Sequence, residues 1–456
     1  MAQQPSLGIL WDNPVDTSEA KAKLDIYAAH GIDYIQLNHP VNTETLSLLR
    51  DTPFTILVQL DKPFLTISEI QQKQTNLLQQ FGETADYYRS YLNVAAIGLL
   101  KNSQTFHPDF ADSFSPILDS LSIRSNKEFY FYANENWYYL NAPTKPFATL
   151  YSDSAFHFSD IVSFNTIFSK EVNQNSGLVF FVNSKWLDEA LVSYPEFSES
   201  LLLYSENNQW QVPLPESDES GESQSWMILL LVLLWVTLAI LFKTLPYLRP
   251  MLLRYFLAHR FFVDDILHYR ERAITGGISL MAMHAVFSGI VFYILANSSI
   301  SDAGLDAFYH HMPSLAIVGA NYASFFVFGV LLTLVVQSIA LLWLYLPAKN
   351  LEHFSQAVNL YAGTFFLDFL TATILVTLFV TGFGLTYILT FGALFVLIWF
   401  GAFNISAFDI SRGMGQGTAI YLLLTIGLHT ILSVGLLILF FVNQPLVQIL
   451  ELAINL

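Results

Sequence analysis

Hydrophobic and polar positions follow different patterns in the two halves of the chain. Up to residue 225, short apolar runs alternate with mixed segments, whereas beyond it long apolar stretches are separated by short polar ones. The first long stretch, Trp226–Phe242, contains no charged residue. At 1.5 Å rise per residue it is just long enough to cross a hydrocarbon core of roughly 30 Å. We therefore expect a membrane-spanning helix here.

The same pattern recurs to the end of the chain and predicts six spans. They cover residues 226–242, 274–295, 316–345, 360–382, 384–404 and 419–442. The expected division is an exported domain (1–212), an acidic linker (213–225), the first span (226–242), a basic segment (243–273) and a five-helix membrane domain (274–456).

In the first half, strand-like runs alternate with helical patterns. The runs expected to form strands are residues 7–12, 32–39, 54–61, 94–102, 127–135, 158–165, 177–184 and 200–210. Apolar strands separated by helices are typical of a parallel sheet buried on both faces. Eight such units predict an α/β fold, a (β/α)₈ TIM-barrel-like domain, followed by an all-α transmembrane bundle of six helices. A doubly wound open sheet is the alternative.

Charge separates the two halves as well. Residues 1–225 hold 12 basic and 28 acidic side chains, and the remainder holds 8 and 9. An acidic domain is a poor partner for nucleic acid, so we expect none to bind. The chain has no Cys, which excludes disulfides and thiolate metal sites. No Gly-rich phosphate loop follows a strand, and we expect neither a cofactor nor a metal ion.

The basic residues indicate the orientation in the membrane. Six of the eight in the second half lie just after the first span: Lys243, Arg249, Arg254, Arg260, Arg270 and Arg272. The positive-inside rule places this segment in the cytoplasm of a bacterial inner membrane and residues 1–225 in the periplasm or outside. We expect that a signal peptide has been removed and that Met1 is not native. The basic segment predicts an amphipathic helix on the lipid surface, or a docking helix for a cytoplasmic partner.

Several runs of the first half carry a family likeness. They are HGIDYIQLNHP (30–40), LNVAAIGLLKNSQ (92–104), FSDIVSFNTIF (158–168), GLVFFVNSKW (177–186) and SLLLYSENNQW (200–210). In this order they resemble strands two, four, six, seven and eight of the (β/α)₈ glycoside hydrolases with paired catalytic glutamates, of the β-galactosidase and cellulase type. The membrane half resembles uncharacterised bacterial polytopic families with Yip1-like hydropathy, a likeness that implies no chemistry.

The departures from the hydrolase pattern determine the expected activity. The resemblance puts the acid/base position at Ser103, after a retained Asn102, and the nucleophile position at Asn183 or Ser184. Hydrolases of this type need two carboxyl groups, roughly 5–5.5 Å apart when they retain and 6.5–9.5 Å apart when they invert configuration. Neither Ser nor Asn can replace them. The domain is therefore expected to be a pseudoenzyme that binds partners or serves as a scaffold.

An active register is the alternative. Asn134-Glu135 looks like the catalytic Asn-Glu pair, and Glu206 looks like a nucleophile at a strand end. This register makes the chain a membrane-tethered glycoside hydrolase. It requires another strand before Leu7 and one after Glu206, and the sequence offers only six residues and an acidic linker there.

Retained sugar binding is a further hypothesis, since sugar C–H faces stack on aromatic rings; simple packing is its alternative. The candidate residues are Trp11, His39, Asn102, Asn134, Trp137, Asn165 and Trp210. The expected partners are membrane lipid and proteins of the cell envelope, with a glycan as an alternative ligand.

Four polar side chains lie deep within the predicted spans: Asp368, His284, His429 and Gln337. A carboxylate in hydrocarbon is costly and usually faces a partner. Asp368 paired with a His would form a proton relay or a polar clamp, and a relay would favour a small transporter. The alternative is one helix–helix hydrogen bond for each group.

Overall fold

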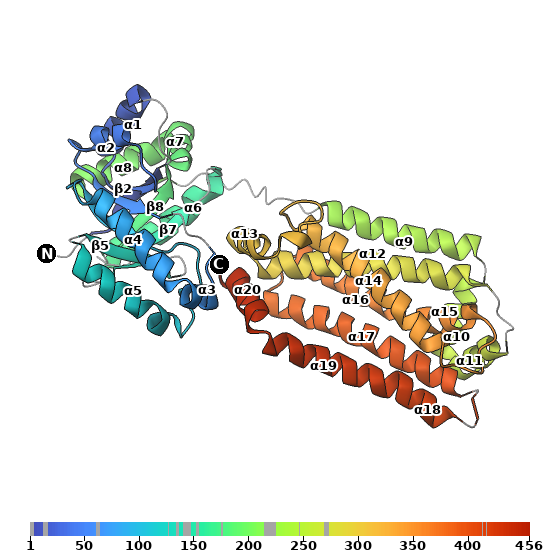
Figure 1. The fold of residues 1–456 in the computed structure, drawn as a ribbon. Helices are drawn as coiled ribbons and strands as arrows, with labels where there is room; N and C mark the ends of the chain where they lie inside the picture. The colour runs from blue at the N-terminus through green and yellow to red at the C-terminus, as the bar shows by residue number, and fades with distance from the viewer. Residues whose placement is uncertain are drawn as a thin grey trace. The chain divides into compact units, whose positions relative to one another are not determined.

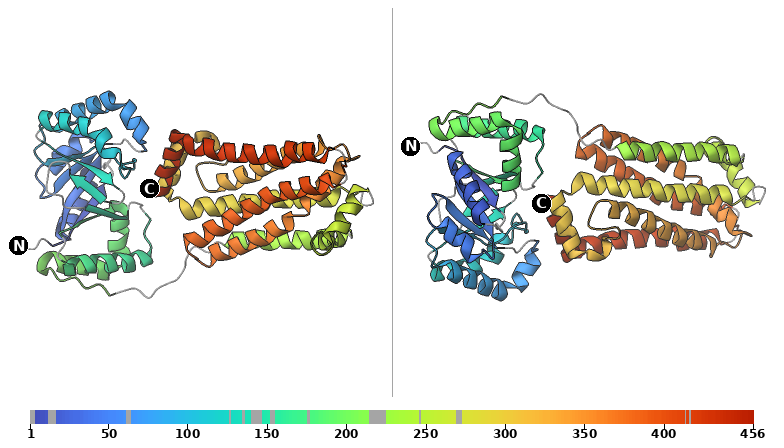
Figure 2. Two further views of the ribbon diagram at one scale, coloured as in Figure 1. Left: turned by 90° about the horizontal axis from the view of Figure 1, so that it is seen from below. Right: turned by 90° about the horizontal axis from the view of Figure 1, so that it is seen from above.

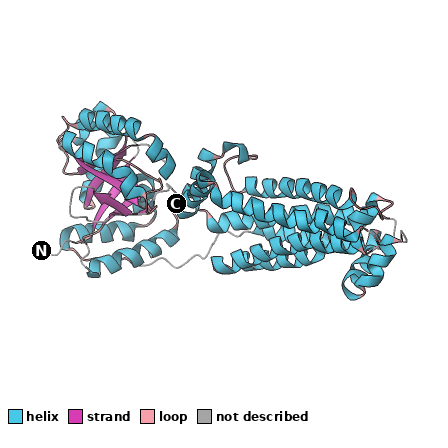
Figure 3. Ribbon diagram, turned by 60° about the horizontal axis from the view of Figure 1, so that its bottom comes forward, coloured by secondary structure: helices cyan, strands magenta, loops and turns pink. Residues whose placement is uncertain are grey.

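The computed structural model describes residues 4–11, 17–60, 64–125, 127–133, 136–139, 147–151, 155–174, 177–213, 225–245, 247–268, 273–412, 414–415 and 417–456. Contacts divide the chain into two compact units, Met1–Gly221 and Glu222–Asn455. The strands drawn in Figure 3 belong to the first unit.

The first unit alternates strands with helices for most of its length (Figure 1). Its elements are β1 (Ser6–Trp11), α1 (Thr17–Ala29), β2 (Ile32–Asn38), α2 (Thr43–Leu49), β3 (Thr55–Gln59), α3 (Ile67–Gln72), α4 (Gln74–Tyr88), β4 (Val94–Gly98), α5 (Phe110–Arg124), β5 (Glu128–Ala133), β6 (Asn136–Tyr139), β7 (Phe147–Tyr151), α6 (Phe158–Gln174), β8 (Val179–Asn183), α7 (Ser184–Ser193) and α8 (Pro195–Asn207).

Local sequence explains where several helices begin. The Asn42 side chain accepts a hydrogen bond from the Glu44 amide at the start of α2. Thr66 and Glu69 form a reciprocal capping box at the start of α3. Such caps satisfy amide groups that have no partner within the helix. Pro195 begins α8, where its missing N–H costs nothing.

The strands form a curled, mostly parallel sheet. β1 to β5 pair in parallel in chain order, β7 pairs with β8 in parallel, and β8 pairs with β1. β6 is antiparallel to both β5 and β7. The structure therefore shows an α/β unit with a curled sheet but departs from a regular (β/α)₈ barrel, because a β-meander replaces helix–strand units between β5 and β7.

Two expected strands prove to be helical. Residues 158–165 belong to α6, whose buried Ile161, Phe164 and Phe168 follow helical spacing. Residues 200–207 belong to α8, which buries Phe197, Ser200 and Leu201. The expectation of strands here was wrong because aromatic-rich apolar runs fit both periods over a few residues. β6 and β7 lie in a stretch for which no strand was expected.

Helices cover the outside of the sheet, as Figure 2 shows from two sides. A large apolar core lies between the strands and these helices, and it includes Ile9, Ile35, Phe81, Phe114 and Trp186, all buried. A smaller cluster lies on the other face of the strands, with Leu57, Ala96, Tyr130, Tyr132, Val179 and Phe181. Burial of both faces explains why these strands read as continuous apolar runs.

The second unit is helical. Its elements are α9 (Ser225–Thr244), α10 (Leu248–Leu257), α11 (His259–Leu267), α12 (Thr275–Ser299), α13 (Asp302–His311), the short helix η1 (Pro313–Leu315), α14 (Ala323–Tyr345), α15 (Phe354–Ala362), α16 (Phe365–Val380), α17 (Leu385–Ser411), α18 (Thr418–Leu422), the π-helical turn η2 (Leu423–Gly427), α19 (Leu428–Val442) and α20 (Gln444–Asn455).

Among the described residues of this unit, six helical stretches are long and apolar enough to cross a membrane, which confirms the six expected spans. They are Trp226–Thr244, Thr275–Ser299, Ala323–Tyr345, Phe354–Val380, Leu385–Ser411 and Thr418–Val442. The fourth combines α15 and α16, and the sixth combines α18, η2 and α19. Long helices of the unit run side by side in Figures 1 and 2.

The basic segment forms two helices, α10 and α11, where a single amphipathic helix was expected. The chain bends at Ala258, whose ψ of 48° is not helical. Met251 and Tyr255 of α10 and Phe262 of α11 are buried in the core of the bundle. The amphipathic pattern therefore reflects packing on the bundle, while Leu257 and Phe261 remain exposed.

Candidate functional site

A polar cluster joins three helices inside the second unit. His284 of α12 places Nε2 2.9 Å from Asp368 Oδ2 of α16. Gln337 of α14 places its side-chain nitrogen 2.8 Å from His284 Nδ1. All three residues are fully buried. The structure thus brings together three of the four predicted intramembrane polar residues.

The hydrogen bonds of the cluster are compatible with two protonation states of His284. With the Gln337 amide donating to Nδ1, the proton of a neutral His284 lies on Nε2 and is donated to Asp368. Rotation of that amide would present Oε1 to Nδ1–H and suit a doubly protonated ring. Such amide orientations are assigned from the hydrogen-bond network. The cluster can therefore accommodate either state of His284 after one side-chain rotation.

Aromatic rings surround His284. It stacks on Phe365 at a centroid distance of 4.1 Å and on Phe395 at 5.3 Å, and Trp399 meets it edge-on at 5.3 Å. These rings hold the imidazole in place between the helices. The apolar surroundings strengthen the interaction with Asp368 by excluding water.

The helices α12 and α14 carry further polar groups next to this cluster. Ser288 and Thr333 are buried, and neither hydroxyl has a hydrogen-bond partner among the described residues. They lie one helical turn from His284 and Gln337, respectively. The two helices approach closely, since a Cβ on Gly329 would lie 2.9 Å from Phe292 Cβ. Small residues commonly permit such contacts between membrane helices.

A second polar cluster was missed from the sequence. His259 of α11 places Nε2 2.9 Å from Asp409 of α17, and Arg412 follows at 3.6 Å. Arg254 pairs with Asp265 at 3.3 Å and links α10 to α11. The available signal was Asp409, the one acidic residue between Leu385 and Val442 in the sequence, because a carboxylate at the end of a span needs a partner.

His429 lies apart from the His284 cluster. Its Nδ1 is 3.2 Å from Asn404 Oδ1, and its ring packs on Phe400 and Phe403. The structure therefore selects His284 as the histidine that pairs with Asp368.

In the first unit, the residues at the expected catalytic positions serve local structure. Ser103 is buried, and its Oγ accepts from the Leu65 amide at 3.1 Å and donates to the Lys101 carbonyl at 3.3 Å. The Asn183 side chain accepts from the Lys185 amide at 2.9 Å and caps α7. Ser184 is the first residue of that helix and is buried. Asn102 has a positive φ of 50°, which suits a tight loop.

Polar side chains also pack on the face of the curled sheet that carries the smaller apolar cluster, which we call the inner face. Tyr132 donates to Gln36 at 2.9 Å, and Gln36 lies 3.5 Å from Gln59. Gln59 in turn donates to the Leu60 carbonyl at 3.0 Å. Gly98 leaves room for Gln59 and Tyr130, because a Cβ there would lie 2.0 Å from Gln59 Oε1. The inner face is therefore packed.

The predicted sugar-binding residues do not form one site. Trp11 is buried, and Trp210 donates to Asn165 at 2.9 Å while packing on Phe168. Asn165 lies on α6, so its expected position at a strand end was wrong. His39 precedes a cis Pro40 and accepts from the Tyr88 hydroxyl at 3.0 Å. Burial lowers the pKa of His39 below its ordinary value.

The carboxylates of the hydrolase alternative are placed as follows. Glu206 lies on α8 and is exposed, so its expected position at a strand end was wrong. Asn134 and Glu135 lie outside the described residues, as does the side chain of Trp137, whose backbone belongs to β6. Among the described residues, no group of three or more His, Asp or Glu side chains is placed to hold a metal ion.

No known protein-family profile and no curated protein matches this sequence. The geometry of the chain therefore carries the functional argument.

Proposed function

We propose that the chain is a bacterial inner-membrane protein whose periplasmic residues 1–212 form a non-hydrolytic relative of the (β/α)₈ glycoside hydrolases. The domain acts as a binding or scaffold subunit of a cell-envelope assembly, and the six-span bundle holds it at the membrane. A curled, mostly parallel sheet and six apolar helices support this reading.

The observation that carries the proposal is the role of Ser103 and Asn183. Where the resemblance calls for two carboxyl groups, a hydroxyl and an amide support a loop and a helix start. Neither group can protonate a leaving oxygen or form a glycosyl ester.

The hydrolase alternative receives less support. Glu206 is exposed on α8, a helix that follows the last strand, whereas paired catalytic glutamates lie at strand ends. An exposed carboxylate on that helix is hydrated and is not positioned for nucleophilic attack.

The full-length chain tests the absence of hydrolysis. We expect the wild type, Glu135→Gln and Glu206→Gln to release the phenol from a panel of aryl glycosides no faster than buffer without protein. Turnover by the wild type that disappears in Glu135→Gln would overturn the proposal.

The scaffold role is tested by crosslinking native membranes and measuring the size of the complexes that contain this chain. A complex larger than the chain itself, which is lost when residues 1–212 are removed, supports the role. A crosslinked product of the size of the chain alone contradicts it.

A small transporter is the second candidate, favoured by the buried His284–Asp368 pair. Intramembrane ionisable groups often mark proton pathways. Proteoliposomes with a pH-sensitive dye would test this candidate: proton flux that is lost in Asp368→Asn supports it, and flux equal to that of protein-free vesicles excludes proton transport.

A further inference from the structure

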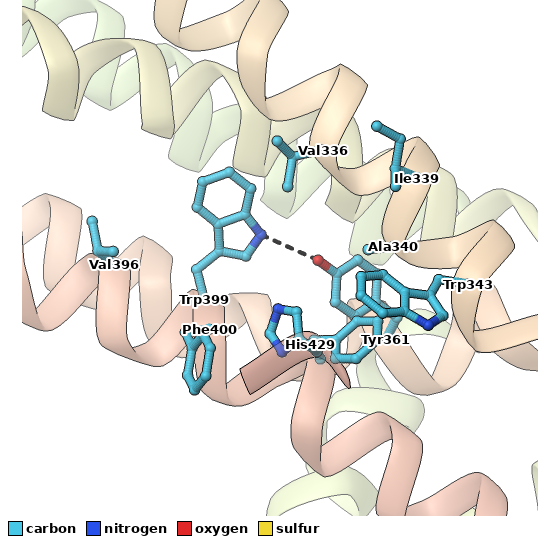
Figure 4. Close-up of a pocket in the computed structure, with 10 residues that line it drawn as sticks. Val336, Ile339, Ala340, Trp343, Tyr361, Val396, Trp399, Phe400 and His429 are labelled. Atoms are coloured by element: carbon cyan, nitrogen blue, oxygen red, sulfur yellow. Dashed lines mark hydrogen bonds between the residues drawn. The ribbon is translucent and has the colours of Figure 1, made fainter. Parts of the chain in front are cut away.

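A pocket opens in the second unit between α14, α17 and α19, and the function proposed above does not use it. Figure 4 shows its lining, and its volume is about 270 Å³. Six of its lining residues carry aromatic rings: Trp343, Tyr361, Trp399, Phe400, Phe403 and His429. Such walls suit a flat, apolar ring better than a saturated chain.

The pocket opens toward the lipid. Val336 and Ile339 of α14 and Val396 of α17 line it, and they are 38%, 55% and 51% exposed. Each lies within a membrane-capable span. The molecules that can reach this opening are therefore those dissolved in the hydrocarbon of the bilayer.

The lining also offers hydrogen-bonding atoms without protein partners. Tyr361 accepts a hydrogen bond from Trp399 Nε1 at 3.1 Å, which Figure 4 marks, and its own proton has no acceptor among the described residues. His429 donates through Nδ1 to Asn404, which leaves Nε2 as an acceptor with no described partner. The pocket thus presents one free donor and one free acceptor.

An unpaired polar group in an apolar site is costly, so these two atoms favour a ligand with oxygens of its own. A saturated acyl chain would leave both unpaired. A quinone carbonyl can accept from Tyr361, and a quinol hydroxyl can donate to His429. We propose that this pocket binds the ring of an isoprenoid quinone or quinol, whose tail leaves between α14 and α17 into the bilayer.

A π-helical turn borders this pocket. The π-helical turn Leu423–Gly427 lies one turn before His429, and its Leu424 carbonyl accepts from Trp343 Nε1 at 2.9 Å. This bond fixes the Trp343 ring as one wall. π-turns occur frequently at functional sites.

The test uses the full-length protein in phosphatidylcholine nanodiscs that contain no quinone. A benzoquinone with one isoprenoid unit is added, and quenching of tryptophan fluorescence is followed. We expect saturable quenching for the wild type and for Trp235→Phe, which removes a tryptophan outside the lining. Tyr361→Phe removes the hydrogen bond to the quinone carbonyl and should weaken the apparent affinity about fivefold to tenfold. The corresponding quinol is titrated in parallel, and its affinity should fall by a similar factor in His429→Phe, because His429 Nε2 can accept only from a hydroxyl.

Ala340→Phe fills the pocket and should abolish saturation. If this variant does not fold, as judged by its elution and melting, Tyr361→Phe alone decides the outcome. Quenching that rises linearly and equally in wild type and variants shows simple partitioning and overturns the proposal. Equal competition by geranylgeraniol, an isoprenoid alcohol without a ring, also overturns it, because the site would then recognise a chain.

Discussion

His284 and Asp368 form a fully buried pair at 2.9 Å although 84 residues separate them in the sequence. Their helices, α12 and α16, thus bury two polar side chains that neither helix could satisfy alone. Gln337 of α14 completes the contact from the other side of the imidazole.

Breaking this pair should destabilise the bundle. His284→Leu leaves a buried carboxylate without its donor, which typically costs about 3–5 kcal/mol. The double variant His284→Leu with Asp368→Leu should recover most of that loss, because apolar pairs often replace buried ion pairs at little cost. Unfolding in mixed micelles, followed by circular dichroism, measures both. Equal stability of the single variant and the wild type would refute this account.

The stability of the first unit should depend on pH in part through His39. Its lowered folded pKa means that the unfolded chain takes up a proton first, near pH 6.5. This contribution is fully present above about pH 6.5 and is lost as the pH falls from there toward the folded value. His39→Gln should remove that part of the slope. Melting temperatures of the wild type and His39→Gln at about pH 7.5 and about pH 5.5 test this prediction. An equal fall in melting temperature for the two proteins would count against it.

Packing at Gly98 should be intolerant of one added methyl group. A Cβ there would meet Gln59 Oε1 at 2.0 Å and Tyr130 at 2.6 Å, so Gly98→Ala should cost about 1–3 kcal/mol. Gly82→Ala in α4 is the matched control, because its nearest neighbour would be Arg124 at 3.7 Å. It should be neutral or slightly stabilising. Denaturant unfolding compares them, and equal stabilities would contradict the packing described.

Ser103 and Asn183 should matter for stability. Ser103→Ala leaves the partly buried Leu65 amide without its acceptor, at a cost of about 1 kcal/mol. Asn183→Ala removes a helix cap worth about 1 kcal/mol. Glu206→Gln, on the exposed face of α8, should change stability by less than about 0.5 kcal/mol. A larger effect of Glu206→Gln than of Ser103→Ala would argue for a role of that carboxylate.

The features that the sequence predicted are those imposed by length and burial. A span must be apolar over about twenty residues, so all six could be found. Strands with two buried faces, such as β3 and β8, read as plain apolar runs. The helix α6 was missed because Ile161, Phe164 and Phe168 sit among other apolar residues, which obscures the helical period.

The sequence predicted a buried polar contact at Asp368 but not which residue would be its partner. A deep Asp368 demands a hydrogen-bond donor, and the sequence offers two histidines within the predicted spans, His284 and His429. Which one meets it depends on the rotation of α12 and α19 about their axes, a tertiary property. Ser103 and Asn183 could be recognised as non-catalytic, but their hydrogen bonds to Leu65 and Lys185 depend on loop geometry.

The π-helical turn Leu423–Gly427 accommodates an extra residue within the sixth span. Such a turn holds one surplus residue relative to an α-helical turn. Deleting Ile426 should therefore restore regular winding while the helix from Leu428 to Val442 keeps the same side toward Asn404. A deletion in a regular stretch of the same span would instead rotate the residues after it by about 100°. The turn thus makes this one position of the span tolerant of a change in length.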